Sequence, residues 1–484
     1  MCRTVRVVLS LILTIAAASS LTAAPPVELG SRRELFVDGY LIDKLNGVKL
    51  TLSRPTDEGV AIRFDKPWEG LFCGYCTIIK DGELYRCYYR GMHTAGTDGS
   101  EEECTCYAES KDGIHWTKPN LGLFEMHGTR ENNVILTKAA PATHNFSPFL
   151  DTRPDVSPSE RFKALGGTSP KGLVGFTSAD GIRWQKVREE PLFNVEGWAF
   201  DSQNVCFWSP TEQQYLLYFR KVPKGVRAVA RATSKDFIHW SAPEMMTYSD
   251  TGTHVPAHHL YTNQTHPYFR APHIYVATSA RFMPNRQVLD AKQAEAVGVH
   301  PKYFGDTSDA ILMTSRGGTR YDRTFPEGFL RPGIGYENWV SRTNYPALNI
   351  VQTGPTEMSF YANQNYGQPT AHLHRYSLRL DGLASVQAPD AGGEFTTKPL
   401  TFSGQQLLLN FSTSAAGGIR TEIQDSEGTP IPGFALEDAV ETIGNEIERA
   451  VTWKKGSRLE SLAGKTIRLR FVMRDADLFA LRFE

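Results

Sequence analysis

The chain lacks the features of a membrane-spanning or nucleic-acid-binding protein. Its one long apolar run, residues 7–18, is shorter than the ~20 residues that a helix needs to cross a bilayer, and no later segment can replace it. Its 52 basic and 53 acidic residues are mixed along the sequence, with a formal charge of −1. We therefore expect no membrane insertion and no nucleic-acid partner.

Cysteine is also scarce, and an even number remains after residue 24. These six are Cys73, Cys76, Cys87, Cys104, Cys106 and Cys206. In an exported chain they permit disulfides. The CxxC and CxC spacings also allow a zinc site. Because the text around them is strand-like, pairing or plain burial between neighbouring strands is favoured, and we predict no metal and no cofactor.

The N-terminus has the layout of a secretory signal peptide. Arg3 and Arg6 precede the apolar run, and a stretch of small residues at 16–24 follows it. No lipobox-like cysteine follows the run, so a lipid anchor is not indicated. We expect residues 1–24 to be a signal peptide and the protein to be secreted or periplasmic.

A recurring phrase organises the rest of the chain. The copies are SKDGIHW from Ser110, SADGIRW from Ser178, SKDFIHW from Ser234, the degenerate SRGGTRY from Ser315 and a weaker echo, RLDGLASV, from Arg379. The phrase predicts a strand that ends at Ser and a turn in which Asp accepts backbone N–H bonds. Gly allows a positive φ there, and the aromatic residue folds back over the sheet. The first four serines are 56 to 81 residues apart, which is room for four short antiparallel strands, the unit of a β-propeller.

The predicted fold class is all-β, a five-bladed β-propeller at residues 30–388 followed by a β-sandwich, jelly-roll-like, at residues 389–484. The predicted blades end near Leu136, Phe193, Tyr248, Phe329 and Ala388. Helical periodicity is nearly absent except in DAKQAEAVGV, after Asp290, which we place as an insertion in the fourth blade. The early strands ELFVDGYLI and VKLTLSR are expected to close the ring by joining the last blade. Alternating strands such as TIRLRFVMR predict the sandwich.

The blade phrases and the order of the two domains resemble the five-bladed propeller glycosidases, the superfamily of glycoside hydrolase families 32, 43, 68 and 117. The likeness is closest to exported bacterial proteins described as family 32 N-terminal-domain-like. The family 32 signature WMNDP is absent. The resemblance implies a carbohydrate substrate and catalysis by paired carboxylates, without a metal.

In such propellers the innermost strand of each blade starts at a central funnel, so acids just before those strands can meet on one substrate. This rule selects Glu69, Asp201 and Glu357, before the first, third and fifth inner strands. We predict Asp201 as base or nucleophile and Glu357 or Glu69 as acid. The second blade has His144 and Asn145 where the superfamily often has an acid, and Asp151 lies at the far end of that strand.

Other polar and aromatic residues near these strands are predicted to bind substrate. They are Trp68, His144, Asn145, Gln203, Asn204, His259, Tyr261, Arg270 and Trp339. Several come from the histidine-rich segment 254–273. That segment can be interpreted as a sugar-binding wall that bonds hydroxyls or pairs with a carboxylate or sulfate, or as a metal site, although no acid cluster lies nearby in the sequence.

Three functions remain open. The first is a secreted glycoside hydrolase acting on a poly- or oligosaccharide, and the second is a non-catalytic propeller that binds glycans or a cell-surface partner. The third is a sialidase-like enzyme, in which Arg270, Arg331 and Arg342 would have to form an arginine triad. The sequence predicts no oligomeric state.

Overall fold

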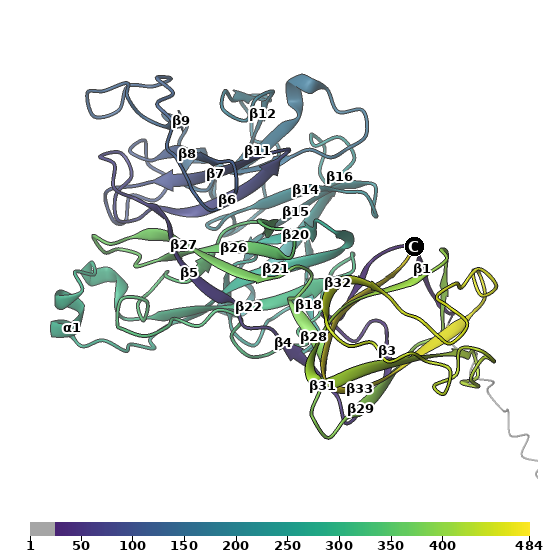
Figure 1. Cartoon of the computed structure of the whole chain (residues 1–484). Helices are drawn as coiled ribbons and strands as arrows, with labels where there is room; N and C mark the ends of the chain where they lie inside the picture. The colour runs from purple at the N-terminus through teal and green to yellow at the C-terminus, as the bar shows by residue number, and fades with distance from the viewer. Residues whose placement is uncertain (1–24) are drawn as a thin grey trace, which may run out of the picture.

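The computed structural model describes residues 25–484, and the predicted signal peptide lies outside the described residues. Figure 1 shows a stack of twisted sheets, the propeller, beside a second β region formed by the C-terminal part of the chain. Within residues 25–484 no helix is both long and apolar enough to cross a membrane.

The first three blades are four-stranded antiparallel sheets. Blade 1 consists of β6 (Gly74–Asp81), β7 (Leu84–Gly91), β8 (Cys104–Ser110) and β9 (Val134–Leu136). Blade 2 consists of β10 (Ser147–Leu150), β11 (Phe162–Gly166), β12 (Val174–Ser178) and β13 (Gln185–Lys186). Blade 3 consists of β14 (Val205–Ser209), β15 (Gln214–Lys221), β16 (Ala228–Ser234) and β17 (Glu244–Met245). Blade 1 ends at the predicted Leu136, whereas blades 2 and 3 end at Lys186 and Met245, before the predicted Phe193 and Tyr248.

Blade 4 is less regular, and its inner edge is made of two short strands that both pair with one long strand. Its strands are β19 (His259–Thr262), β20 (Thr265–Tyr268), β21 (Ala271–Met283) and β22 (Thr307–Ser315). Beside them, β18 (Thr247–Tyr248) pairs with β23 (Arg320–Tyr321). The predicted insertion contains α1 (Ala291–Ala296), which Asp290 and Gln293 cap at its N-terminus.

Blade 5 is completed by a strand from the N-terminal part of the chain, so the ring is closed between distant segments. Its strands are β24 (Tyr345–Pro346), β25 (Val351–Gln352), β26 (Glu357–Gln364), β27 (His372–Arg379) and β5 (Thr56–Arg63). The predicted closing strands, ELFVDGYLI and VKLTLSR, are therefore wrong. The closing strand is β5, the next strand along the chain. Most of its side chains are exposed, so its sequence does not show the apolar alternation that predicts a strand.

The second region is a single ten-stranded sheet that wraps around one apolar core. Its C-terminal strands are β28 (Ala384–Ala388), β29 (Gly393–Thr397), β30 (Leu400–Phe402), β31 (Leu407–Asp425), β32 (Asn445–Ala450) and β33 (Ile467–Phe483). Its N-terminal strands are β1 (Val27–Gly30), β2 (Glu34–Leu35), β3 (Ile42–Asn46) and β4 (Lys49–Leu52). The propeller therefore spans residues 56–379, and the predicted boundaries at 30 and 388 are wrong, because β4 and β28 pair with each other outside the ring.

The recurring phrase forms the turn that the sequence predicts. Asp112 Oδ1 accepts the N–H groups of Ile114 and His115 at 2.8 Å each, and Asp180 and Asp236 make the equivalent pairs of bonds. The indole N–H of Trp116 donates back to the carbonyl of Gly113 at 3.1 Å. Although burial opposes the charge, these bonds lower the pKa of Asp180 to about 2. The turn aspartates are therefore structural.

The two regions are joined by a group of ion pairs that we call the charged seam, made of Arg33, Glu34, Asp38, Arg270, Arg316, Asp381 and Glu448. Arg316 lies 2.5 Å from a carboxylate oxygen of Glu34 and 3.0 Å from one of Asp38. Arg270 contacts Glu448 at 2.8 Å, and Arg33 contacts both Glu448 and Asp381. Asp381 belongs to the fifth echo of the repeat, which here anchors the second region to the propeller.

The starts of the five inner strands meet at one face of the propeller, which we call the funnel mouth. The rings of Tyr75 and His144 lie 5.6 Å apart, those of Tyr261 and Tyr345 lie 5.0 Å apart, and His144 Nε2 lies 3.6 Å from Asp201. Each of these residues belongs to a different blade. Side chains far apart in the sequence therefore converge there.

Between residues 25 and 484, four short 3₁₀ helices lie in the loops. They are η1 (Ala142–His144), η2 (Pro158–Glu160), η3 (Pro223–Gly225) and η4 (Pro301–Tyr303). The first carries His144 and the fourth carries Tyr303, so both help to build the funnel mouth.

Candidate active site

Asp201 lies in a short loop before β14 that buried amides hold in place. The Asn145 side chain donates to the carbonyls of Phe200 at 2.7 Å and Ser202 at 2.8 Å, and Asn204 donates to the same two carbonyls at 3.1 and 3.0 Å. Phe200 has a φ of 66° in this loop. Asn145 and Asn204 were predicted to bind substrate, but both are fully buried and instead fix the backbone around Asp201.

The carboxylate of Asp201 is partly exposed and faces two cationic groups. Arg220 Nη2 lies 2.5 Å from one of its oxygens, and His144 Nε2 lies 3.6 Å from the other. Burial opposes the negative charge, but the guanidinium and the imidazole outweigh it and hold the pKa of Asp201 well below its usual range. Asp201 is therefore ionised at neutral pH.

His144 is buried at the end of η1 and links Asp201 to a second acid. Its Nδ1 lies 2.8 Å from Glu103, which has no exposed surface. A carboxylate only accepts, so we assign the Nδ1 proton to this bond. Burial disfavours the imidazolium, but the nearby Asp201 carboxylate and the bond to Glu103 prevail and raise the pKa of His144.

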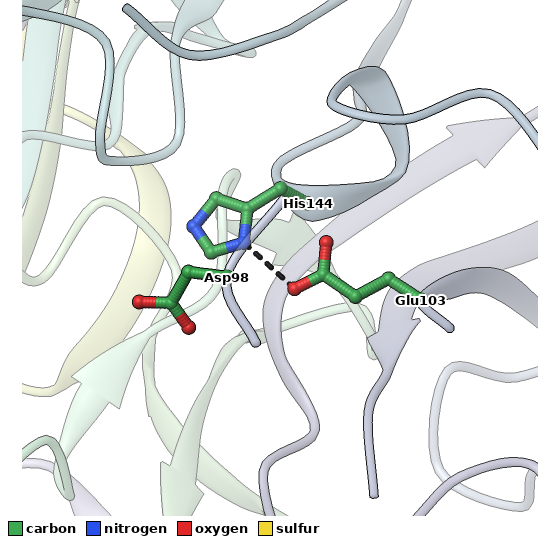
Figure 2. Close-up of side chains that lie close together, drawn as sticks. All are labelled: Asp98, Glu103 and His144. Carbon is green, nitrogen blue, oxygen red and sulfur yellow. Dashed lines mark hydrogen bonds and ion pairs between the residues drawn. The ribbon is translucent and has the colours of Figure 1, made fainter. Parts of the chain in front are cut away.

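A third acid, Asp98, lies near the same imidazole and near Glu103 (Figure 2). It is exposed and comes from the loop between β7 and β8. The possible ligand atoms of Asp98, Glu103 and His144 lie within 4.8 Å of one another. A cation fits poorly here, since Nδ1 already donates to Glu103 and Arg90 Nη1 lies 3.2 Å from that nitrogen.

Arginine and tyrosine side chains form the rest of the pocket wall. The lining residues include Tyr75, Arg90, Tyr261, Arg342, Tyr345, Asn363 and Tyr366. Burial raises the pKa of Tyr75 and of Tyr345, so both are neutral phenols. Trp198 is 51% exposed at the rim, with the Arg220 guanidinium 5.2 Å from its ring. A flat exposed ring of this kind can stack against the apolar face of a sugar.

The channel below the pocket is crossed by buried amides. Gln203 donates to Thr77 Oγ1 at 2.7 Å, and Gln264 donates to Gln203 and to the carbonyl of Pro346 at 2.7 Å each. Gln203 is thus a link between blades and not part of the pocket wall, contrary to its predicted role. The buried amides of Gln203 and Gln264 form the floor of the funnel mouth.

Glu69 and Trp68 are at the funnel end of blade 1 but point into the blade. Glu69 has no exposed surface and accepts from Tyr89 Oη at 2.6 Å, and Lys118 Nζ lies 2.8 Å from its carboxylate. The indole N–H of Trp68 donates to Asn133 at 2.7 Å. The prediction of Glu69 as catalytic acid and of Trp68 as a substrate contact is therefore wrong, because neither side chain can reach a ligand.

Glu357 lies in blade 5, at the end of the blade that is away from the funnel mouth and from Asp201. The inner edge of this blade runs from Tyr345 at the funnel mouth to Gln352, and Glu357 begins the next strand after the turn. Its carboxylate contacts Arg375 at 3.0 Å and Thr353 Oγ1 at 2.7 Å. The predicted pairing of Asp201 with Glu357 is wrong, because Glu357 lies before the second strand of its blade, not the first.

Of the other residues predicted to bind substrate, some lie at the pocket and some lie elsewhere. Tyr261 lies in the pocket wall, and His259 lies beside it, 3.3 Å from Arg227. Arg270 belongs to the charged seam. Trp339 is half-buried and donates to the carbonyl of Gly333 at 3.0 Å.

The histidines of segment 254–273 do not converge. His266 is buried in the propeller, and its pKa is lowered to about 4 by desolvation. His273 lies 3.3 Å from Glu34 at the charged seam. The interpretations as a single sugar-binding wall and as a metal site are therefore both wrong.

The arginines proposed for a sialidase triad do not converge either. Arg270 is at the charged seam, Arg331 lines an outer groove with Arg54 and Tyr376, and Arg342 is at the funnel mouth.

The six cysteines are buried free thiols, and none forms a disulfide. Five of them lie in or beside blade 1, where Cys104 and Cys106 have their sulfurs 3.7 Å apart. Burial raises the pKa of Cys73 and Cys206. The cysteines therefore act as small buried apolar side chains, which is one of the two arrangements that the sequence favours.

The sequence rule missed most of the residues that line the pocket. Arg90 and Arg220 lie near the ends of the second strands of blades 1 and 3, in the matching texts YYRG and YFRK. An antiparallel second strand returns to the funnel mouth, so its end is as well placed as the start of the first strand. This repeated aromatic–Arg pair was the signal that could have found them.

No protein-family model matches the chain. An uncharacterised protein of Mycobacterium tuberculosis, Rv1502, is 24% identical over 149 residues, which is 30% of this chain and 45% of that protein. The match thus spans less than half of the relative.

Several solved structures are similar to this chain, with low sequence identities and low TM-scores. A structure titled "Glycoside hydrolase" has 10% identity and a TM-score of 0.42, covering 67% of this chain and 92% of that one. An N-acetylgalactosamine deacetylase from F. plautii has 13% identity and a TM-score of 0.40, with 74% and 96% covered. The catalytic domain of a Coprinopsis cinerea family 62 α-L-arabinofuranosidase has 9% identity and a TM-score of 0.37, with 68% and 98% covered. The strand pairing of this chain establishes its five-bladed fold without them.

Proposed function

We propose that this protein is a secreted glycoside hydrolase that cleaves a poly- or oligosaccharide at the funnel mouth, with Asp201 and Asp98 as its two catalytic carboxylates. One observation carries the proposal. Two carboxylates that reach solvent, from blade 3 and from the β7–β8 loop, lie near the same buried imidazole where the inner strands begin. Glycoside cleavage needs such a pair, one acid for the leaving oxygen and one carboxylate for the other face of the sugar.

Asp201 is suited to the role of base or nucleophile. Arg220 and His144 keep it ionised, and Asn145 and Asn204 fix its loop, so it is both charged and oriented before substrate binds. It either activates a water molecule or attacks the anomeric carbon itself. His144 and Glu103 are positioning residues in this scheme, since they act through Asp201.

Asp98 is suited to the role of proton donor. Among residues 25–484 its carboxyl group has no hydrogen-bond or ion-pair partner, and it is exposed. A carboxyl group in this position can give its proton to the leaving oxygen of a sugar bound over it. Trp198 would support the sugar ring at the rim.

The test is hydrolysis of a broad glycan panel, measured by chromatography of released sugars. For a cleaved glycan we expect kcat to fall by ~10²–10⁴-fold in Asp201→Asn and in Asp98→Asn. Glu357→Gln is the matched control, an acid changed to its amide at the other end of a blade, and should leave kcat unchanged. Proton NMR of the first product anomer decides between attack by Asp201 and attack by water.

Two results would contradict the proposal. One is a cleaved glycan whose rate is equal in the wild type and in Asp201→Asn. The other is a panel with no cleavage at all, combined with glycan binding that Asp201→Asn retains, in which case the protein is a glycan-binding propeller.

A further inference from the structure

The Arg342 guanidinium at the funnel mouth has no acidic partner. It lies 4.9 Å from the centre of the Tyr303 ring and 5.7 Å from that of Tyr261, and it donates one hydrogen bond to Tyr303 Oη at 3.1 Å. No carboxylate of residues 25–484 comes within the 4.0 Å of an ion pair. It is half-buried, so water cannot fully solvate it.

Arg90 is in a similar state and is more deeply buried. Only 6% of its surface is exposed, and it donates to the carbonyl of Phe72 at 2.8 Å and to Tyr366 Oη at 3.3 Å. Its Nε is buried without a hydrogen-bond partner. Within the described chain no acid forms an ion pair with it either. Both guanidinium groups line the same pocket.

The backbone holds Arg342 in an unusual conformation. Its φ is 60° and that of Asn344 is 58°, both in the left-handed region, which arginine rarely adopts and asparagine adopts more readily. The Asn344 side chain locks the turn by donating to the carbonyls of Ser308 at 2.9 Å and Asn338 at 3.0 Å. Strain of this kind persists where the surrounding structure enforces it, which is common at ligand sites.

Neither guanidinium forms an ion pair, although the charges of Glu103 and Asp98 act on Arg90 from a greater distance. Partial burial of two such cations is costly, and a bound anion offsets that cost. Tyr345 adds a donor, because its buried hydroxyl has no hydrogen-bond partner. We propose that the substrate is an acidic glycan, and that Arg342 and Arg90 bind a carboxylate or sulfate group on the sugar. This inference rests on the proposed function, since it names the substrate class of the same site.

The experiment measures binding by calorimetry in the Asp201→Asn background, in which turnover is expected to be slow. The ligands are trigalacturonate, its methyl ester, and neutral and sulfated galactose trisaccharides. We expect one of the two anionic ligands to bind, and the binding arm identifies carboxylate or sulfate. Adding Arg342→Gln should weaken it about ten- to hundredfold, the range for a charge-assisted hydrogen bond. The neutral ligands should bind weakly and without change.

Two further variants keep the test sharp. Arg331→Gln removes an exposed arginine outside the funnel and should not alter binding. Arg342→Lys keeps the charge but loses the planar fork, so it should bind with intermediate affinity. Equal affinity for charged and neutral ligands, or no change in Arg342→Gln, overturns the inference.

Failure of this inference is distinguishable from failure of the proposed function. Cleavage of neutral glycans, with no preference for acidic ones and no effect of Arg342→Gln, leaves the hydrolase intact and removes the acidic substrate. Binding of an acidic glycan that depends on Arg342, without cleavage of any glycan by the wild type, supports the anion site and removes the hydrolase.

Discussion

Arginine is used in two opposite ways in this molecule, at the charged seam and at the funnel mouth. At the seam every guanidinium faces one or two carboxylates, as Arg316 does with Glu34 and Asp38. At the mouth Arg220 is paired with Asp201, but Arg90 and Arg342 face tyrosines and backbone carbonyls. The arginines of the two regions are buried to a similar extent, so burial alone does not tell a structural arginine from a ligand-binding one. The difference lies in whether the protein supplies the anion or leaves it to a ligand.

The largest effect should come from breaking a pair at the seam. In Arg316→Gln the carboxylates of Glu34 and Asp38, which are 0% and 3% exposed, lose their main partner. We expect the free energy of unfolding to fall by about 3–5 kcal/mol, the cost of an uncompensated buried charge. Urea denaturation measures it, with Arg183→Gln, an exposed partner of Asp180, as the control. A loss equal to that of the control would mean that the seam is not a stabilising contact.

A smaller effect should follow from the titration of His144, which faces Glu103, Asp98, Asp201 and Arg90. Its pKa is raised in the folded protein, so its contribution to stability is complete below the unfolded pKa of about 6.5 and is lost as pH rises through the folded value. We expect the unfolding free energy of the wild type to fall in that alkaline window relative to His144→Gln. Parallel curves for the two proteins would contradict it.

The smallest effect on stability should come from Arg342. Arg342→Gln removes a half-buried charge that has no acidic partner, so we expect the unfolding free energy to stay within about 0.5 kcal/mol of the wild type or to rise. The same urea titration measures it. A loss like that of Arg316→Gln would show that Arg342 is structural and that the contrast between the two regions is false.

Much of the propeller was predictable from a single phrase. The turn made by Ser110, Asp112 and Trp116 is local, so a short motif specifies it, and its copies count the blades. Ring closure is not local. The pairing of β5 with β27 joins residues about 300 positions apart in the chain, and no pattern within either strand encodes its partner.

The candidate site was predictable only in part. Asp201, His144 and Tyr261 were found because each lies where an inner strand begins. Glu357 was misplaced by one strand, since the inner edge of blade 5 is broken into two very short strands. Glu69 stands in the right loop but points the other way, and the direction of a loop side chain depends on packing. Asp98 lies in a loop with no strand signal at all.

The way the chain closes on itself also constrains when it can fold. β5 needs β27, while β1 to β4 need strands that follow residue 383, with β2 waiting for β33 at the end of the chain. During synthesis residues 27–63 therefore lack their strand partners until residues 372–483 have been made. Such a chain stays open until late in synthesis, and its early strands remain unpaired for most of that time.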